Sequence, residues 1–150
     1  MAHTFLVRPG QWMLEGQWLE RQNLPVPVRG KTMIAWDQND WFRMATKLVF
    51  PGHEYTDIVL QYRGRFDQTN RQYSFILQHS EFGNVEGEGL IGPESIVQRY
   101  WVLGSEQQRR SGLETLRQIK DDRYYYSSVN MSGISMSLTS VMEAVIERKP

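Results

Sequence analysis

The chain has 150 residues, 17 basic and 17 acidic residues, and no cysteine. This length fits one domain that buries enough surface to fold without covalent cross-links, so we expect a single domain over residues 1–150. The zero net charge gives no long-range attraction to nucleic acid, and the missing cysteines exclude disulfides and thiolate chemistry. No apolar run is long enough for a membrane span or a signal peptide, so we expect a cytoplasmic protein.

The first half of the chain alternates apolar and polar residues with a period of two, which is typical of half-buried strands. The run 11–21, for example, places Trp12, Leu14 and Trp18 on one face. The same alternation returns in the runs 26–36, 41–50, 56–67 and 72–82. We expect the following residues to point inward: Trp12, Leu14, Trp18, Ile34, Phe42, Ile58, Leu60, Phe75 and Leu77.

The second half continues with shorter or weaker runs. Strands are predicted over residues 85–91, 95–103, 113–120 and 123–131, with a polar turn over residues 106–112. The last run, residues 134–149, fits a helix through the spacing of Leu138, Val141 and Val145, and fits a strand equally by alternation. We favour the strand because its neighbours are strands, and it would then turn Met136, Leu138, Met142, Ala144 and Ile146 inward.

About ten strands, joined by turns of hairpin length, predict an all-β fold. An open sheet of this size would leave two edges and one apolar face exposed, and a sandwich would need longer crossover connections. The sequence therefore predicts a closed antiparallel up-and-down β-barrel.

The opening Gly10-Gln11-Trp12 resembles the Gly-x-Trp start of the calycin superfamily, and residues 80–89 resemble a mid-barrel hairpin of these proteins. Calycins comprise lipocalins, fatty-acid-binding proteins and nitrobindin-like bacterial barrels, so the resemblance implies a lipocalin-like barrel. It also implies a small-molecule carrier, an isomerase, or a lyase that attaches bilin chromophores. The link at residues 22–25 is too short for the helical lid of fatty-acid-binding proteins. No histidine follows His79, so the haem ligand of nitrobindin-like barrels is missing and we expect no cofactor.

Four inward positions are candidate ligand contacts. Trp36, Tyr73 and Phe75 would form an aromatic wall for an apolar ligand, or would only fill the barrel. His79 continues the apolar set of its strand and would offer a hydrogen bond, or would lie at the rim bonded to backbone.

Arginines that share a face with apolar neighbours are candidates for an anion site, since guanidinium matches a carboxylate and an unpaired interior charge is costly. Arg99, Arg117 and Arg123 have this placement, the alternative being exposed arginines in ion pairs. Arg123 and Tyr125 also resemble the Arg-x-Tyr pair that holds the carboxylate in fatty-acid-binding proteins.

We expect the barrel to bind a small apolar or amphipathic ligand. In one form of this hypothesis, the ligand carries an acidic group. No nucleophile elbow, metal-ligand spacing or paired carboxylates are present, so no catalytic or metal-binding residue is predicted. An enzyme of the bilin lyase or isomerase type, a ligand-free scaffold for a partner protein, and a homodimer are left open.

Overall fold

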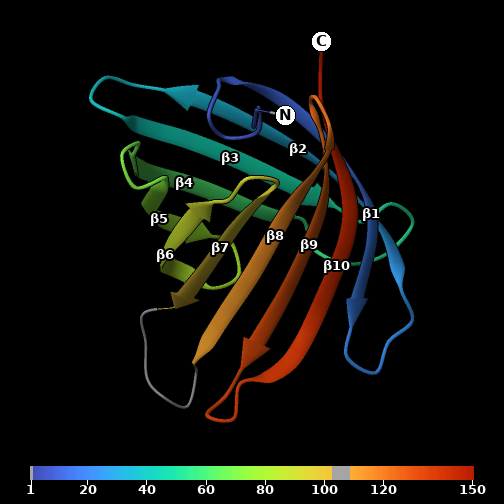
Figure 1. Ribbon diagram of the computed structural model, residues 1–150. Coiled ribbons are helices and arrows are strands. Elements are labelled where there is room, and N and C mark those ends of the chain that lie inside the picture. The colour runs from blue at the N-terminus through green and yellow to red at the C-terminus, as the bar shows by residue number, and fades with distance from the viewer. Residues whose placement is uncertain (1, 103–108) are drawn as a thin grey trace.

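The computed structural model describes residues 2–102 and 109–150, which form a closed barrel of ten antiparallel strands (Figure 1). The strands are β1 (Gly10–Glu20), β2 (Val26–Trp36), β3 (Trp41–Val49), β4 (Ile58–Asp67), β5 (Gln72–His79), β6 (Gly83–Ile91), β7 (Ser95–Val102), β8 (Arg110–Lys120), β9 (Arg123–Ser132) and β10 (Ser137–Arg148). Each strand pairs with the next, and β10 returns to β1. The predicted all-β, up-and-down barrel is confirmed. Within the described ranges, no helix is long and apolar enough to cross a membrane.

Short polar turns join the strands where side chains tolerate left-handed backbone. Asn39 and Asp40, between β2 and β3, have φ angles of 63° and 64°, and Asp122, between β8 and β9, has a φ angle of 60°. Asn and Asp adopt this conformation more readily than other residues with a side chain. These turns reverse the chain within a few residues, which keeps consecutive strands adjacent.

The seam between β1 and β10 closes the barrel. It runs from Trp12 opposite Arg148 to Glu20 opposite Ser140, so the strand interpretation of the last run is confirmed and the helical alternative is wrong. The inward direction predicted for Leu138 is also wrong, and Met136 is not part of the strand but lies half-buried in the turn before β10. An irregularity between Leu138 and Ser140 shifts the register of β10 against β9, and Leu138 is left exposed.

The predicted turn over residues 106–112 is wrong for its last part. Gly112 lies opposite Tyr100 of β7, and Arg110 lies opposite Ser132 of β9, so β8 begins at Arg110. Polar side chains concealed this strand because its inner face is not apolar. Residues 106–108 of the predicted turn, and residue 103 of the predicted strand before it, lie outside the described residues.

The predicted inner face is otherwise confirmed, because all nine residues expected to point inward are buried: Trp12, Leu14, Trp18, Ile34, Phe42, Ile58, Leu60, Phe75 and Leu77. Their opposite faces carry charged and polar residues that contact solvent. One-sided burial of this kind fixes the strand register, since a slip of one residue would expose the whole apolar set.

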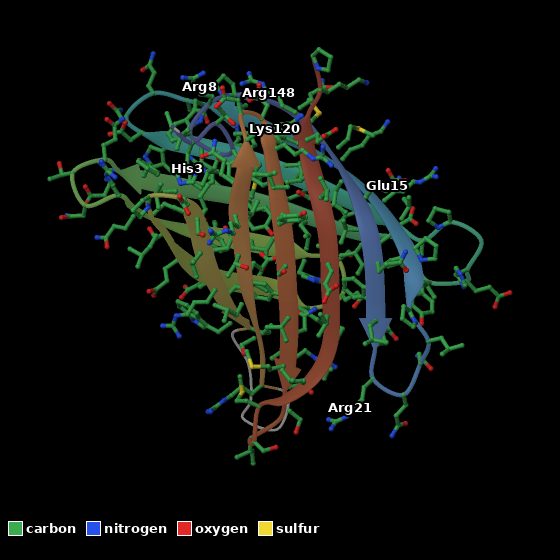
Figure 2. The ribbon with its side chains drawn as sticks, turned by 45° about the vertical axis from the view of Figure 1, so that its right-hand side comes forward. His3, Arg8, Glu15, Arg21, Lys120 and Arg148 are labelled. Carbon is green, nitrogen blue, oxygen red and sulfur yellow. The ribbon has the colours of Figure 1, made fainter. Side chains whose placement is uncertain are left out.

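Residues 2–9, here called the strap, lie over one end of the barrel (Figure 1). Phe5 and Leu6 of the strap are buried against the core, and Phe5 stacks on Trp12 with 5.1 Å between ring centroids. The Tyr124 hydroxyl accepts hydrogen bonds from the backbone N–H groups of Thr4 (3.0 Å) and Phe5 (3.3 Å). We call this the strap end, and the opposite end, with the turns at 21–25, 80–82 and 133–136, the far end. Figure 2 shows His3 at the former and Arg21 at the latter.

Four glycines on the inner wall lie beneath aromatic rings of the preceding strand. The rings and glycines are Phe42 over Gly64, Phe75 over Gly87, Tyr73 over Gly89 and Tyr100 over Gly112. A methyl group added at any of the four would lie 2.2 to 2.5 Å from the nearest ring carbon. The rings therefore lie flat along the wall and do not point at the barrel axis.

The strand register arranges these residues in two rows around the barrel. Row A contains Phe42, Gly64, Phe75, Gly87, Tyr100, Gly112, Asn130 and Ser140. Row B contains Phe66, Tyr73, Gly89, Gln98, Glu114, Ser128, Met142 and Trp18. Each row begins with rings, passes over glycine, and then reaches polar side chains, which are Asn130 and Ser140 in row A and Gln98, Glu114 and Ser128 in row B.

Replacing Gly112 with alanine is expected to lower the free energy of unfolding by about 1–3 kcal/mol, because the new methyl group displaces the Tyr100 ring. Urea unfolding measures this cost, with Ser127→Ala on the exposed face of β9 as the control. The cost should shrink in a Tyr100→Leu background. An equal cost in both backgrounds would show that the ring is not what excludes the methyl group.

Candidate functional site

A strip of polar side chains crosses the inner wall of β7–β10 in the middle of the barrel. Gln98, Glu114 and Ser128 occupy neighbouring positions of row B, and Asn130 and Ser140 occupy neighbouring positions of row A. All five are buried. A buried polar group is unfavourable unless it is hydrogen-bonded, so the partners of this strip indicate its purpose.

The bonds of row B converge on Glu114. The Tyr73 hydroxyl reaches across Gly89 and donates to Oε1 of Gln98 (2.6 Å). Because the oxygen of the Gln98 amide is thereby occupied, its Nε2 faces Glu114 and donates to Oε1 (2.7 Å). The Tyr126 hydroxyl donates to the other carboxyl oxygen (2.5 Å). The network therefore directs neutral donors at both oxygens of one carboxyl group.

Burial raises the pKa of Glu114 above its ordinary value of 4.5. Hydrogen bonds from Tyr126, Gln98 and Ser128 act in the opposite direction without cancelling the effect of burial. The pKa of Tyr126 is itself raised, first by burial and then by the charge of Glu114. An acid that ionises less readily than usual thus sits among neutral donors at the centre of the strip.

Row A supplies a second, smaller cluster closer to the far end. The Tyr100 hydroxyl crosses Gly112 and donates to Oδ1 of Asn130. Nδ2 of Asn130 then donates to the Ser140 hydroxyl (2.8 Å). Both tyrosines of the two rows therefore use a glycine to reach a polar partner two strands away.

Packing on the inner faces of β9 and β10 is tightest towards the strap end. Tyr124 and Ile146 are 0% exposed, whereas Ser128 and Ala144 on the same wall are each 8% exposed. Thr46 on β3 and Tyr126 on β9 belong to the inner faces of their strands but are only half-buried. Both side chains line a small interior cavity of about 10 Å³ beside the polar strip, which has room for about one water molecule.

A pocket of about 470 Å³ lies at the far end, where Val102, Arg110 and Ser132 continue the inner faces of their strands. Phe82 lines it, with the Arg110 guanidinium 5.0 Å from the centre of the ring. The opposite neighbour of Phe82 is His79, stacked at 4.0 Å. Val102, Arg110 and Ser132 lie on the same inner faces of β7, β8 and β9 as the polar strip. The pocket therefore lies at the far end of the wall that carries Glu114.

His79 has a defined proton arrangement. Its Nδ1 accepts hydrogen bonds from the backbone N–H groups of Glu81 (3.1 Å) and Phe82 (3.3 Å), which leaves the proton on Nε2. Burial, assisted by the charge of Arg110, lowers the pKa of His79 to about 4. The imidazole is therefore neutral and presents a single N–H donor.

The four predicted aromatic and imidazole contacts lie on inner faces. Tyr73, Phe75 and His79 are buried on β5, with Tyr73 and Phe75 covering glycines and His79 near the far end. Trp36 lies at the strap end, where its Nε1 donates to the backbone oxygen of Leu6 (2.9 Å) and its ring borders a groove of about 670 Å³. Their role as ligand contacts stays a prediction.

The inward placement predicted for Arg99, Arg117, Arg123 and Tyr125 is wrong. Arg99 and Arg117 are exposed and pair with Glu88 (3.5 Å) and Glu94 (3.2 Å), and Arg123 pairs with Glu147 (3.0 Å) on the outside of the sheet. Tyr125 is 57% exposed.

The error has a physical cause on the outer surface. This surface also carries apolar residues, among them Val97 and Leu113, which are both exposed. Sharing a face with apolar neighbours was therefore no guide to the interior here. An anion site inside the barrel cannot be formed by side chains that lie outside it.

Sequence reasoning missed Glu114, Gln98, Tyr126 and Arg110. A usable signal existed for two of them, because Arg110 and Glu114 share the parity of Gly112 and Leu116 on β8. Gln98 and Tyr126 lie on strands whose two faces are both mixed, so no pattern separated their inner from their outer residues. Across residues 2–102 and 109–150, no group of three His, Asp or Glu side chains is placed to hold a metal ion.

No protein family and no curated protein matches the sequence. Solved structures match the fold. The crystal structure of Rv2717c from M. tuberculosis aligns with a TM-score of 0.72 and 12% identity, over 95% of this chain and 92% of that chain. The S-type phycobiliprotein lyase CPES from Guillardia theta aligns with a TM-score of 0.60 and 12% identity, over 95% of this chain and 88% of that chain. The closed ten-strand barrel and these likenesses fit a calycin-like fold.

The raised pKa of Glu114 predicts a pH-dependent difference between the wild type and Glu114→Gln. The folded protein holds the proton to higher pH than the unfolded chain, so the wild type loses stability as pH rises from about 4.5 through the folded-state pKa. Urea unfolding of both proteins over a pH series should show the variant gaining relative stability as pH rises. A constant difference would contradict the raised pKa.

His79 is expected to stay neutral, with its proton on Nε2, at every pH above about 4. Nitrogen-15 NMR of the imidazole distinguishes the two tautomers and the charged form. Protonation of Nδ1 near neutral pH would show that the N–H groups of Glu81 and Phe82 do not hold the ring as described.

Proposed function

We propose that the barrel binds a small amphipathic molecule in the space beside the polar strip. The observation that carries this proposal is the convergence of Gln98 and Tyr126 on Glu114, in a barrel interior where both donors line a small cavity. Apolar side chains would supply burial without direction, and the polar strip would fix orientation.

The flat rings over glycine support the same proposal. An aromatic side chain that points at the axis fills a barrel, whereas one that lies along the wall lines it. Phe75, Tyr73 and Tyr100 all lie along the wall on β5–β7. Met44 and Thr46 of β3 line the same small cavity as Tyr73. We infer that a flat molecule with one polar edge would lie between these walls when the cavity widens.

An enzyme of the chromophore lyase type is the second candidate. It is favoured by the likeness to the phycobiliprotein lyase and by the raised pKa of Glu114, because a carboxyl group that keeps its proton to higher pH is better suited to donate it. Added biliverdin, a linear tetrapyrrole, tests this candidate, because a barrel that holds it should change its visible absorption. Transfer to an acceptor protein would be the further requirement for a lyase.

A neutral, flat apolar dye, Nile red, is expected to bind and to fluoresce more strongly in the barrel. Ala144→Leu should weaken binding by about tenfold or more, because the added side chain projects from the inner face of β10 into the space beside Tyr126. Glu143→Leu, on the outer face of the same strand, is the control for added bulk and lost charge.

Both variants should retain a cooperative unfolding transition. Equal weakening by the two variants would place the dye outside the barrel, and no binding by the wild type would contradict the proposed function.

A further inference from the structure

Glu114 is a buried acid whose hydrogen-bond partners are uncharged. Its carboxyl group is buried, and in the described part of the chain the groups that bond to it are the neutral side chains of Gln98, Tyr126 and Ser128. A lone buried carboxylate is costly, while a carboxylate that faces a cation gains strongly from low local polarity. The fold therefore retains an acid where a neutral amide would cost less.

The donor directions show which ionisation state the network suits. Tyr73 fixes the Gln98 amide so that its N–H group points at the carboxyl, and Tyr126 donates to the second oxygen. Donors on both oxygens stabilise the carboxylate form. The arrangement is prepared for a negative charge, and what it lacks among the described residues is the positive charge.

A small cavity in the barrel interior lies beside the groups that donate to the carboxyl group. Gln98 and Tyr126, which both donate to Glu114, line this cavity of about 10 Å³. A ligand that widens the cavity would meet Tyr126 and Glu114 together.

We propose that the ligand carries a basic nitrogen, an ammonium group or a protonated ring nitrogen, that pairs with ionised Glu114. This inference rests on the proposed binding function and names the chemistry of the polar edge. Binding transfers the charge of the nitrogen into the barrel and favours ionised Glu114, so the protonated fraction of Glu114 releases its proton to solvent. Affinity for such a cation therefore rises with pH and falls as Glu114 becomes protonated.

The other titratable groups around Glu114 do not change charge over the pH range of the experiment. They are Tyr62 on β4, Tyr73 on β5, Tyr100 on β7 and Tyr126 on β9, and burial raises the pKa of each above the usual tyrosine value. All four stay neutral over the range of the experiment.

Nile blue and Nile red test the proposal, because they share one flat ring system and differ in a cationic nitrogen against a neutral oxygen. Fluorescence titrations give the ratio of their dissociation constants for the wild type, for Glu114→Gln and for the control Glu143→Gln on the outer face of β10. We expect Glu114→Gln to shift the ratio by about tenfold or more against Nile blue, and Glu143→Gln to leave it unchanged. Retained Nile red binding shows that the variant keeps its fold.

The pH dependence provides the second measurement. In the wild type, Nile blue should bind more tightly at about pH 8 than at about pH 5, while Nile red should not change. Proton release on Nile blue binding, measured in weak buffer, decides the matter in the wild type if Glu114→Gln does not fold.

The outcomes separate the two proposals. An unchanged dye ratio in Glu114→Gln, or no proton release, overturns the cation proposal. Nile red binding without any preference for the cation does the same and leaves the binding function standing. Failure of both dyes to bind contradicts the binding function itself.

Discussion

The close contact between aromatic rings and glycines on neighbouring strands determines the interior of this barrel. Where Tyr73 covers Gly89 and Tyr100 covers Gly112, no side chain larger than hydrogen fits on the covered strand. The rings consequently lie along the wall, and their hydroxyl groups reach polar partners two strands away. The position of the polar strip and the orientation of the Gln98 amide both depend on this contact.

The same contact explains why charge and packing are distributed as they are. The strap end, where Phe5 and Trp12 stack, is apolar and dense. The middle contains an acid that burial alone would disfavour, held by donors that the flat rings place there. The dense apolar packing and the buried acid thus occupy different levels of one barrel, and Trp12 contributes to the first without contacting the second.

The fold could be predicted from the sequence because alternation reports directly on one-sided burial. It was reliable for β1–β5, whose outer faces are mostly polar, and gave the inward direction of Phe42 and Leu77 correctly. On β7–β9 both faces mix polar and apolar residues, so Arg117 was assigned to the wrong side. The network around Glu114 depends on which residues become opposite one another when ten strands pair, and no local pattern contains that register.

The seam between β1 and β10 has a consequence for how the chain folds. Nine of the ten strand pairings join neighbours in sequence, and only this one joins the two ends of the chain. A meander of hairpins can therefore form from local contacts, while closure must overcome the entropy of a loop that spans almost the whole chain. The strap adds bonds between the two ends of the chain, since its Thr4 hydroxyl accepts a hydrogen bond from the Asp122 N–H and its Pro9 carbonyl accepts one from Arg148. These bonds join the first residues of the chain to its last strands, so they hold the closed barrel together and contribute nothing to a single hairpin.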